Sequence, residues 1–276
     1  MTFGSLFAGI GGFDLGFERA GLVPKWQVEI DPFCRAVLAK HWPDVRRYED
    51  VRTVGAHNLE RVDVLCGGFP CQDISVAGRG AGIEGARSGL WAEFDRLIGE
   101  LRPGFVVVEN VSALLARGLG RVLGDLAARG YDAEWDCLPA SAFGAPHQRD
   151  RIWIIADAST NRLQERGDVA CVGAETQNGE FARREAHRMA ASPIGADAER
   201  GQQPLWRPAG RTRWFGESVP RHRDWPLASQ PVLGRGSDGL PNRLDRLKGL
   251  GNAVVPDITE WIGRRLMSAD PGSREE

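Results

Sequence analysis

Residues 62–72 read Val-Asp-Val-Leu-Cys-Gly-Gly-Phe-Pro-Cys-Gln, an apolar run of strand type that ends in a glycine-rich turn. A second run of this type, Phe105–Val108, leads into Glu109-Asn110-Val111. Because the carboxyl ends of parallel strands meet at one edge of a sheet, we expect Cys71 and Glu109 to emerge there together. A nucleophilic thiol paired with a proton donor indicates covalent catalysis.

Similar apolar runs alternate with helical patterns over the first 157 residues: Gly4–Phe7, Trp26–Ile30, Val62–Cys66, Phe105–Val108, Trp135–Leu138 and Arg151–Ile155. This alternation predicts βαβ units and a doubly wound α/β domain whose parallel sheet is covered on both faces. The periodicity fades between residues 158 and 239, which are rich in Gly, Pro and Arg, and returns in the helical pattern of Pro256–Met267. We therefore expect the last helix to pack back on the first domain and the irregular region to be an insertion.

The overall composition excludes several classes of protein. The chain has 276 residues and a net charge of −2, so a polyanionic partner would need a local basic patch. Its amino terminus has no signal-peptide pattern and no long apolar run, which favours the cytosol and no membrane anchor. Its five cysteines form no CxxC pair, so we predict neither disulfides nor a metal site, and we expect Cys34, Cys66 and Cys137 to be structural.

The segment Phe7–Gly16 is rich in glycine and lies between a predicted strand and a predicted helix. Such a turn lets the backbone approach a ligand closely, although many α/β folds need one for steric reasons alone. Glu29, at the end of the next strand, is placed where an acidic side chain accepts hydrogen bonds from ribose hydroxyls, which favours a nucleoside cofactor. Asp50 is either a contact for an adenine amino group or a surface carboxylate.

The loop Gly67–Gly89 contains seven glycines and carries Cys71 directly after Pro70. Long loops of this kind often close over a substrate, and a thiol at a strand-to-loop junction can be exposed and have a tuned pKa. A carboxylate after a run of β-branched residues is partly desolvated, which raises its pKa and suits Glu109 to proton donation. The alternative for Glu109 is an acid at a helix N-terminus.

Two further motifs follow in the chain. Gly144–Arg151 ends in Arg149 and Arg151, which could brace the site loops and meet a phosphate or carboxylate, or form a structural ion-pair cluster. Gly249–Pro256 contains Asn252 just before the last helix, where it could complete the cofactor pocket.

In content, order and spacing these motifs resemble the DNA (cytosine-5) methyltransferase family, over residues 2–156 and 240–267. The resemblance implies a Rossmann-like methyltransferase sheet with a small irregular target-recognition domain inserted before the last helix. Residues 1–157 and 240–276 would form the catalytic and cofactor-binding domain, and residues 158–239 the target-recognition region. The chain departs from the family at His147, where glutamine is common, and in its short insertion.

The resemblance also implies a mechanism and the residues that perform it. Cys71 would attack C6 of a flipped cytosine, and Glu109 would bind and protonate the N3 edge. Asn110 and Pro70 would shape the pocket, while Arg151 and Arg149 would hold the flipped nucleotide or the loop. S-adenosyl-L-methionine would contact Phe7, Gly9, Ile10, Gly11, Gly12, Glu29, Ile30, Asp50, Val51, Leu90, Asn252 and Ala253.

A basic stretch in the insertion points to nucleic acid. Between Arg200 and Arg235 there are seven arginines and two acids, interleaved with Trp206, Trp214, Phe215 and Trp225. This excess suits phosphate contact and groove readout, whereas the alternative is a solvated loop whose tryptophans form a small core. The predicted DNA contacts are Gln72, Ser75, Arg79, Arg207, Arg211, Arg213 and Arg235.

The leading hypothesis is a monomeric prokaryotic or phage-encoded enzyme that methylates duplex DNA, with or without a separate cognate restriction endonuclease. A tRNA cytosine-5 methyltransferase with the same core is the second. The third is a catalytically silent nucleic-acid-binding relative, in which Cys71 would be dispensable.

Overall fold

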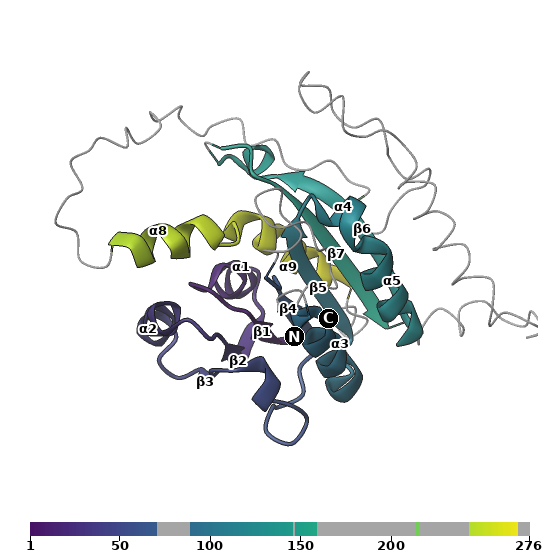
Figure 1. The fold of residues 1–276 in the computed structure, drawn as a ribbon, viewed down its shortest axis with the longest axis horizontal. Coiled ribbons are helices and arrows are strands. Elements are labelled where there is room, and N and C mark those ends of the chain that lie inside the picture. The colour runs from purple at the N-terminus through teal and green to yellow at the C-terminus, as the bar shows by residue number, and fades with distance from the viewer. Residues whose placement is uncertain (71–88, 146, 159–213, 216–242, 270–276) are drawn as a thin grey trace, which may run out of the picture.

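The computed structural model describes residues 1–70, 89–145, 147–158, 214–215 and 243–269 of the chain (Figure 1). Its centre is a seven-stranded sheet in the order β3-β2-β1-β4-β5-β7-β6. The strands are β1 (Thr2–Leu6), β2 (Val23–Val28), β3 (Arg46–Tyr48), β4 (Val64–Gly67), β5 (Phe105–Val111), β6 (Tyr131–Pro139) and β7 (Asp150–Ala158). The helices are α1 (Gly12–Arg19), α2 (Pro32–His41), α3 (Leu90–Leu101), α4 (Leu114–Arg117), α5 (Leu119–Ala128), α8 (Arg243–Asn252) and α9 (Pro256–Ala269), with 3₁₀ turns η1 (Val51–Thr53) and η3 (Ala140–Phe143).

The predicted α/β fold is confirmed, with two differences in the sheet. The short strand β3 was not predicted; its three residues pair in parallel with β2. The expectation of an all-parallel sheet was wrong at β7, which runs antiparallel to both β5 and β6. Only residues 140–149 connect β6 to β7, and a parallel return needs a crossover of a dozen or more residues.

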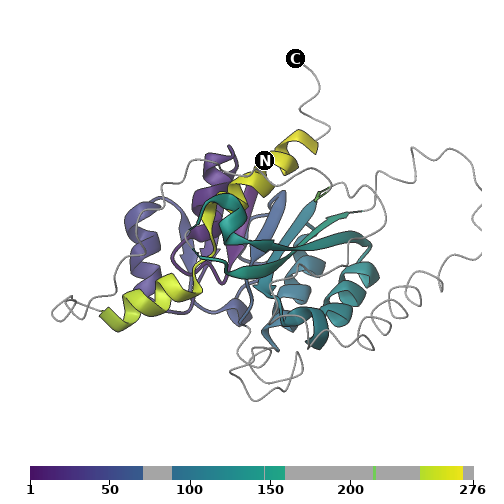
Figure 2. The same cartoon turned by 90° about the horizontal axis from the view of Figure 1, so that it is seen from above.

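Helices cover both faces of the sheet, as predicted. Val106 and Val108 of β5 belong to the core cluster that contains buried residues of α3, α4 and α5, whereas Val107 belongs to the cluster formed with α1 and α9. Alternate residues of a strand point to opposite faces, so a β-branched run such as this suits a sheet buried on both sides. Figure 2 shows α1 and α9 together on one side of the sheet, and α3 and α5 on the other.

The last helix returns to the first domain, also as predicted. The Thr259 hydroxyl of α9 donates to the Gly12 carbonyl of α1 over 3.1 Å. A Cβ atom at Gly16 would overlap Thr259 and the backbone of Pro256, so the lack of a side chain there allows α1 and α9 to touch. No helix in the described part of the chain is long and apolar enough to cross a membrane.

A carboxylic acid is buried beneath the first helix. Asp14 of α1 is fully buried over β1 and β2 and accepts a hydrogen bond of 2.8 Å from Gln27 Nε2. Burial raises the pKa of Asp14 to about 6, and the hydrogen bond from Gln27 opposes this only in part. The folded protein therefore favours the protonated acid relative to the unfolded chain.

The raised pKa predicts a specific dependence of stability on pH. A group with a raised folded-state pKa stabilises the fold fully below its unfolded pKa of 3.8, and loses that contribution as the pH rises through about 6. The loss amounts to about 3 kcal/mol. Asp14→Asn removes the titration and keeps an acceptor for Gln27. The unfolding free energy of the variant, measured with urea, should therefore rise relative to that of the wild type between pH 4.5 and 7.5. A difference in unfolding free energy that stays constant with pH would contradict this.

Candidate functional site

Among the described residues, the predicted catalytic and cofactor-binding groups gather at one edge of the sheet. The chain passes from β1 to β2 and β3 on one side, then returns to the other side of β1 at β4, so the crevice between the two halves opens after β1 and β4. The carboxyl ends of the first five strands meet there. Because β7 is antiparallel, its amino end with Asp150 and Arg151 lies at the same edge, opposite the end of β5.

The turn after β1 has an unusual backbone. Phe7, Gly9 and Gly11 have positive φ angles of 52°, 56° and 88°. A Cβ atom at Gly9 would meet nothing within 4 Å, so glycine serves the conformation there and leaves the space above the turn open. Gly11 is the N-cap of α1 and has no side chain to accept from the first amides of the helix, although the Asp14 amide bonds its own carboxylate.

Glu29 joins the end of β2 to this turn. One carboxylate oxygen accepts from the Gly9 amide over 2.7 Å, and the other accepts from the Asp31 amide over 2.8 Å. Each oxygen keeps a further lone pair for a ligand hydroxyl. The adjacent Ile30 exposes 59% of its surface, which offers an apolar contact beside these polar groups.

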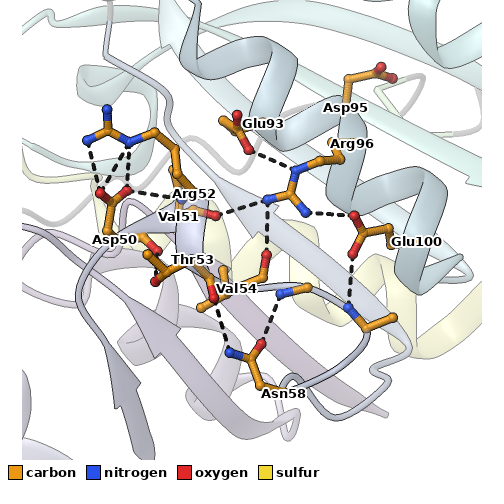
Figure 3. A network of polar contacts seen from close by, with 12 residues as sticks. Asp50, Val51, Arg52, Thr53, Val54, Asn58, Glu93, Asp95, Arg96 and Glu100 are labelled. Carbon is orange, nitrogen blue, oxygen red and sulfur yellow. Dashed lines mark hydrogen bonds and ion pairs between the residues drawn. The ribbon is translucent and has the colours of Figure 1, made fainter.

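Asp50 follows β3 and is held by a neighbour. Arg52 donates to both carboxylate oxygens of Asp50, with Nε 3.0 Å from Oδ1 and Nη2 2.9 Å from Oδ2 (Figure 3). The hydrogen bond from Arg52 lowers the pKa of Asp50, so the carboxylate stays charged and able to accept. Val51 beside it is buried, and Leu90, the first residue of α3, packs against the same core cluster.

On the other side of the crevice, Asn110 fixes the chain that leads to Cys71. Its side-chain amide donates to the Phe69 carbonyl over 3.1 Å, and its oxygen accepts from the Val111 amide over 2.9 Å. Both Asn110 and Phe69 are buried. The backbone before Pro70 is thereby attached to β5.

Glu109 and Arg151 form an ion pair in this region. The prediction that Glu109 follows the strand was wrong: Glu109 lies within β5, because β7 pairs with this strand as far as Val111. Arg151 is opposite Val111, two residues from Glu109 on the same face, and its Nε lies 3.1 Å from Glu109 Oε1. A Cβ atom at Gly68 would lie 2.8 Å from Glu109 Oε2, so that glycine makes room for the carboxylate.

Two effects act on the proton of Glu109 in opposite directions. Burial raises its pKa, and the charges of Arg151 and Arg149 together with the Arg151 hydrogen bond lower it. Only 12% of the Glu109 side chain is exposed, so burial is the larger effect and the pKa of Glu109 is raised overall. Glu109 can therefore hold a proton beside a cation, which suits a group that donates to a ligand.

Arg149 connects two distant segments at this edge. It has a positive φ of 42°, and its guanidinium donates to the carbonyls of Gly251 and Ala253 over 2.7 and 2.8 Å. These contacts bring the α8–α9 turn, with Asn252, to the site. Lys248 of α8 also pairs with Asp31 at 2.6 Å, beside Glu29.

Several predicted residues lie outside the described ranges: Cys71, Gln72, Ser75, Arg79, Arg207, Arg211, Arg213 and Arg235. The expectation for three other cysteines agrees with the structure. Cys34 and Cys66 are buried and Cys137 is half-buried. Burial raises the pKa of the Cys34 and Cys137 thiols to about 11 and about 12, and that of Cys66 as well. None of these three is suited to act as a thiolate near neutral pH.

Two aromatic residues of the insertion pack on the first domain. Trp214 is 1% exposed and makes an edge-to-face contact with Phe105, with ring centroids 5.7 Å apart. Its amide donates to Glu134 of β6 over 3.0 Å, and Phe215 lies against Trp261 of α9. Phe105 begins β5 whereas Glu109 is near its end, so Trp214 belongs to the core and not to the site edge.

Two residues were not predicted to contribute to the site: Gly68, which the sequence places only in the glycine-rich loop Gly67–Gly89, and Arg96, treated below. Gly68 carried no separate signal, because the atom it makes room for comes from another strand. Arg96 had a weak one, since Glu93 and Glu100 stand three and four residues away on the same helix.

Residues 1–194 match the family model of C-5 cytosine-specific DNA methylases. A curated relative, the type II methyltransferase M2.BsuMI of Bacillus subtilis, is 36% identical over 160 residues, which are 55% of this chain and 41% of that protein. The type II methyltransferase M.NgoBI of Neisseria gonorrhoeae is 33% identical over 154 residues, covering 54% and 48%. The chain thus spans less than half the length of these two relatives.

A solved structure from an Escherichia coli prophage, described as a candidate DNA modification methyltransferase, is also similar. It is 28% identical, with a TM-score of 0.50, and the match covers 62% of this chain and 49% of that one. The Entamoeba histolytica methyltransferase EhMeth shares the fold at 14% identity, with a TM-score of 0.51 and coverage of 64% and 57%.

The buried position of Trp214 predicts a large effect on stability. Trp214→Ala should lower the free energy of unfolding by about 3–5 kcal/mol, because it leaves a cavity against Phe105. Trp214→Phe keeps an aromatic ring and should cost less. Urea unfolding followed by circular dichroism measures both. A Trp214→Ala protein as stable as the wild type would show that the contact contributes nothing to the fold.

Proposed function

The chain belongs to the C-5 cytosine-specific DNA methylase family, and we propose that it transfers a methyl group from S-adenosyl-L-methionine to C5 of a cytosine in duplex DNA. The single observation that carries the proposal is the Glu109–Arg151 pair at the sheet edge where Asn110 holds the chain that leads to Cys71. The proposed chemistry needs an acid with a raised pKa, which Glu109 supplies, and a nucleophile, which Cys71 supplies two residues after the attached Phe69.

The residues present fit the cofactor. Three features offer contacts for the parts of the cofactor: the open space above Gly9 for its methionine part, the remaining lone pairs of Glu29 for its ribose, and the exposed Ile30 for its adenine. Asp50, charged beside Arg52, can accept from an amino group, and Asn252 is brought near by Arg149. When bound, S-adenosyl-L-methionine supplies an electrophilic methyl group.

Cys71 provides the activation that cytosine C5 lacks. Its thiolate would form a bond to C6, the C5–C6 π pair would form a C4–C5 double bond, and the C4–N3 π pair would move to N3, which takes the proton of Glu109. C5 would then be nucleophilic and would take the methyl group as its bond to the cofactor's sulfur breaks, which leaves S-adenosylhomocysteine. A base would remove the C5 proton, the C5–C6 double bond would form again as the C6–sulfur bond breaks and the thiolate leaves, and the N3 proton would return to Glu109.

Arg151 has a positioning role in this scheme. Its contact with Glu109 would fix the carboxyl group on the face of β5 that meets the base, while burial raises the pKa of that group and so favours its protonated form. Arg149 acts on the α8–α9 turn through the carbonyls of Gly251 and Ala253.

The target base must leave the duplex stack, at a cost of a few kcal/mol that protein contacts offset. We assign that task to the loop of residues 67–89 and target recognition to residues 158–239, with residues 1–157 and 240–276 as the catalytic domain. Trp214 and Phe215, although within the insertion, pack with the catalytic core. The separate endonuclease, the monomeric state and the cytoplasmic location stay predictions.

Covalent trapping tests the proposed reaction and its substrate together. Wild-type protein with cofactor and a long random-sequence duplex containing 5-fluorocytosine should form a complex stable to denaturing electrophoresis, since fluorine at C5 blocks the elimination step. Cys71→Ser should form none. Absence of a complex with the wild type would contradict the mechanism, and a complex only with 5-fluorocytosine-containing tRNA would move the substrate to RNA.

Glu109→Gln isolates the proton donor. Glutamine keeps a hydrogen-bond donor for N3 but cannot give up a proton, so kcat should fall by about 100-fold or more while S-adenosylhomocysteine still binds. Glu60→Gln, an exposed glutamate paired with Lys25, is the matched control. A kcat for Glu109→Gln within threefold of the control would show that Glu109 is not the acid.

A further inference from the structure

Arg96 of α3 is bonded to the main chain of another segment. Its Nη2 donates to the carbonyls of Val51 and Val54, over 3.1 and 3.0 Å (Figure 3). Val51 begins η1, directly after Asp50, and both valines are buried. One guanidinium thus satisfies two carbonyls of a short loop that has no strand partner.

Two carboxylates of the same helix orient this guanidinium. Nε lies 2.8 Å from Glu93 Oε2, and Nη1 lies 2.7 Å from Glu100 Oε1. All three nitrogens of Arg96 therefore have partners, in a planar arrangement that a lysine ammonium cannot reproduce. The second oxygen of Glu100 accepts from the Ala56 amide over 2.9 Å, which extends the attachment along the loop.

The loop is also closed on itself. Asn58 accepts from the Gly55 amide and donates to the Thr53 carbonyl, and Thr53 bonds the Asp50 carbonyl through both its amide and its hydroxyl. These bonds join residues 50–58 into one hydrogen-bonded unit, and Arg96 with Glu100 attaches that unit to α3.

Both ends of this attachment meet the proposed cofactor site. Asp50 and Val51 are candidate cofactor contacts on one side of the crevice, and Leu90 at the start of α3 is one on the other. If η1 moved away from α3, Asp50 and Val51 would be separated from Leu90. Pre-arranged contacts bind more tightly because the ligand does not have to order them.

We propose that Arg96 is a positioning residue for the cofactor: by holding the carbonyls of Val51 and Val54 against α3, it sets Asp50 and Val51 in their binding positions before the cofactor arrives. This inference rests on the proposed function, which supplies the cofactor. Arg96 touches no reacting atom and acts through η1.

Equilibrium binding of S-adenosylhomocysteine, measured by isothermal titration calorimetry, tests the role directly. Arg96→Met should raise the dissociation constant about tenfold or more. Arg264→Met is the matched control, because Arg264 also forms an i,i+4 ion pair, with Glu260, on an exposed helix face far along the chain. Its affinity should stay within twofold of the wild type.

Hydrogen exchange supplies a second measurement that separates positioning from general stability. Amides of residues 51–56 should exchange faster in free Arg96→Met than in free wild type, and bound S-adenosylhomocysteine should restore part of the protection. If Arg96→Met does not fold, Arg96→Lys is the variant to test. Its ammonium group can donate to only one of the two carbonyls, so the affinity should fall by about threefold.

The outcomes distinguish the two proposals. Wild-type protein that binds neither S-adenosylhomocysteine nor S-adenosylmethionine would overturn the proposed function and this role with it. Wild-type binding together with unchanged affinity in a folded Arg96 variant would overturn the positioning role alone.

Discussion

The pairing of β1 with β2 on one side and β4 on the other is the constraint on which the rest of the structure depends. It divides the sheet into two halves at β1, so that the turn carrying Gly9 opens into the crevice between them. Glu29 and Asp50 follow β2 and β3 in one half, whereas Pro70 follows β4 and Glu109 lies near the end of β5 in the other. The groups proposed to hold a nucleoside and those proposed to act on a base therefore meet at one edge of the sheet, although they lie far apart in the sequence.

The reversal of β7 adds the cations to this edge. A parallel strand in its place would carry Arg149 and Arg151 to the opposite end of the sheet. Since β7 runs antiparallel, Arg151 reaches Glu109 and Arg149 reaches the α8–α9 turn. The same reversal sends the insertion out at the far edge, where Asp157 pairs with Phe105 and where Trp214 returns to pack.

Charge and burial are balanced differently at Asp14, Asp50 and Glu109. Asp14 has a neutral amide partner and its pKa rises, while Asp50 is only half-buried, beside Arg52, and its pKa falls. Glu109 has both burial and an arginine, and burial prevails. Because its pKa is raised, Glu109 is protonated to a greater extent than an ordinary surface glutamate, which suits it to give a proton to a ligand that accepts one.

The sequence by itself determined the type and order of the elements, the glycine turn after β1, the return of the last helix and the family. These follow from hydrophobic period and from motifs, which are properties of neighbouring residues. Only the tertiary structure decided the direction of β7, the extension of β5 past Glu109, the partner of Arg149, the burial of Trp214 and the attachment of η1 by Arg96. Each of these depends on a partner some 40 to 100 residues away, and a local pattern holds no information about which distant group will meet it.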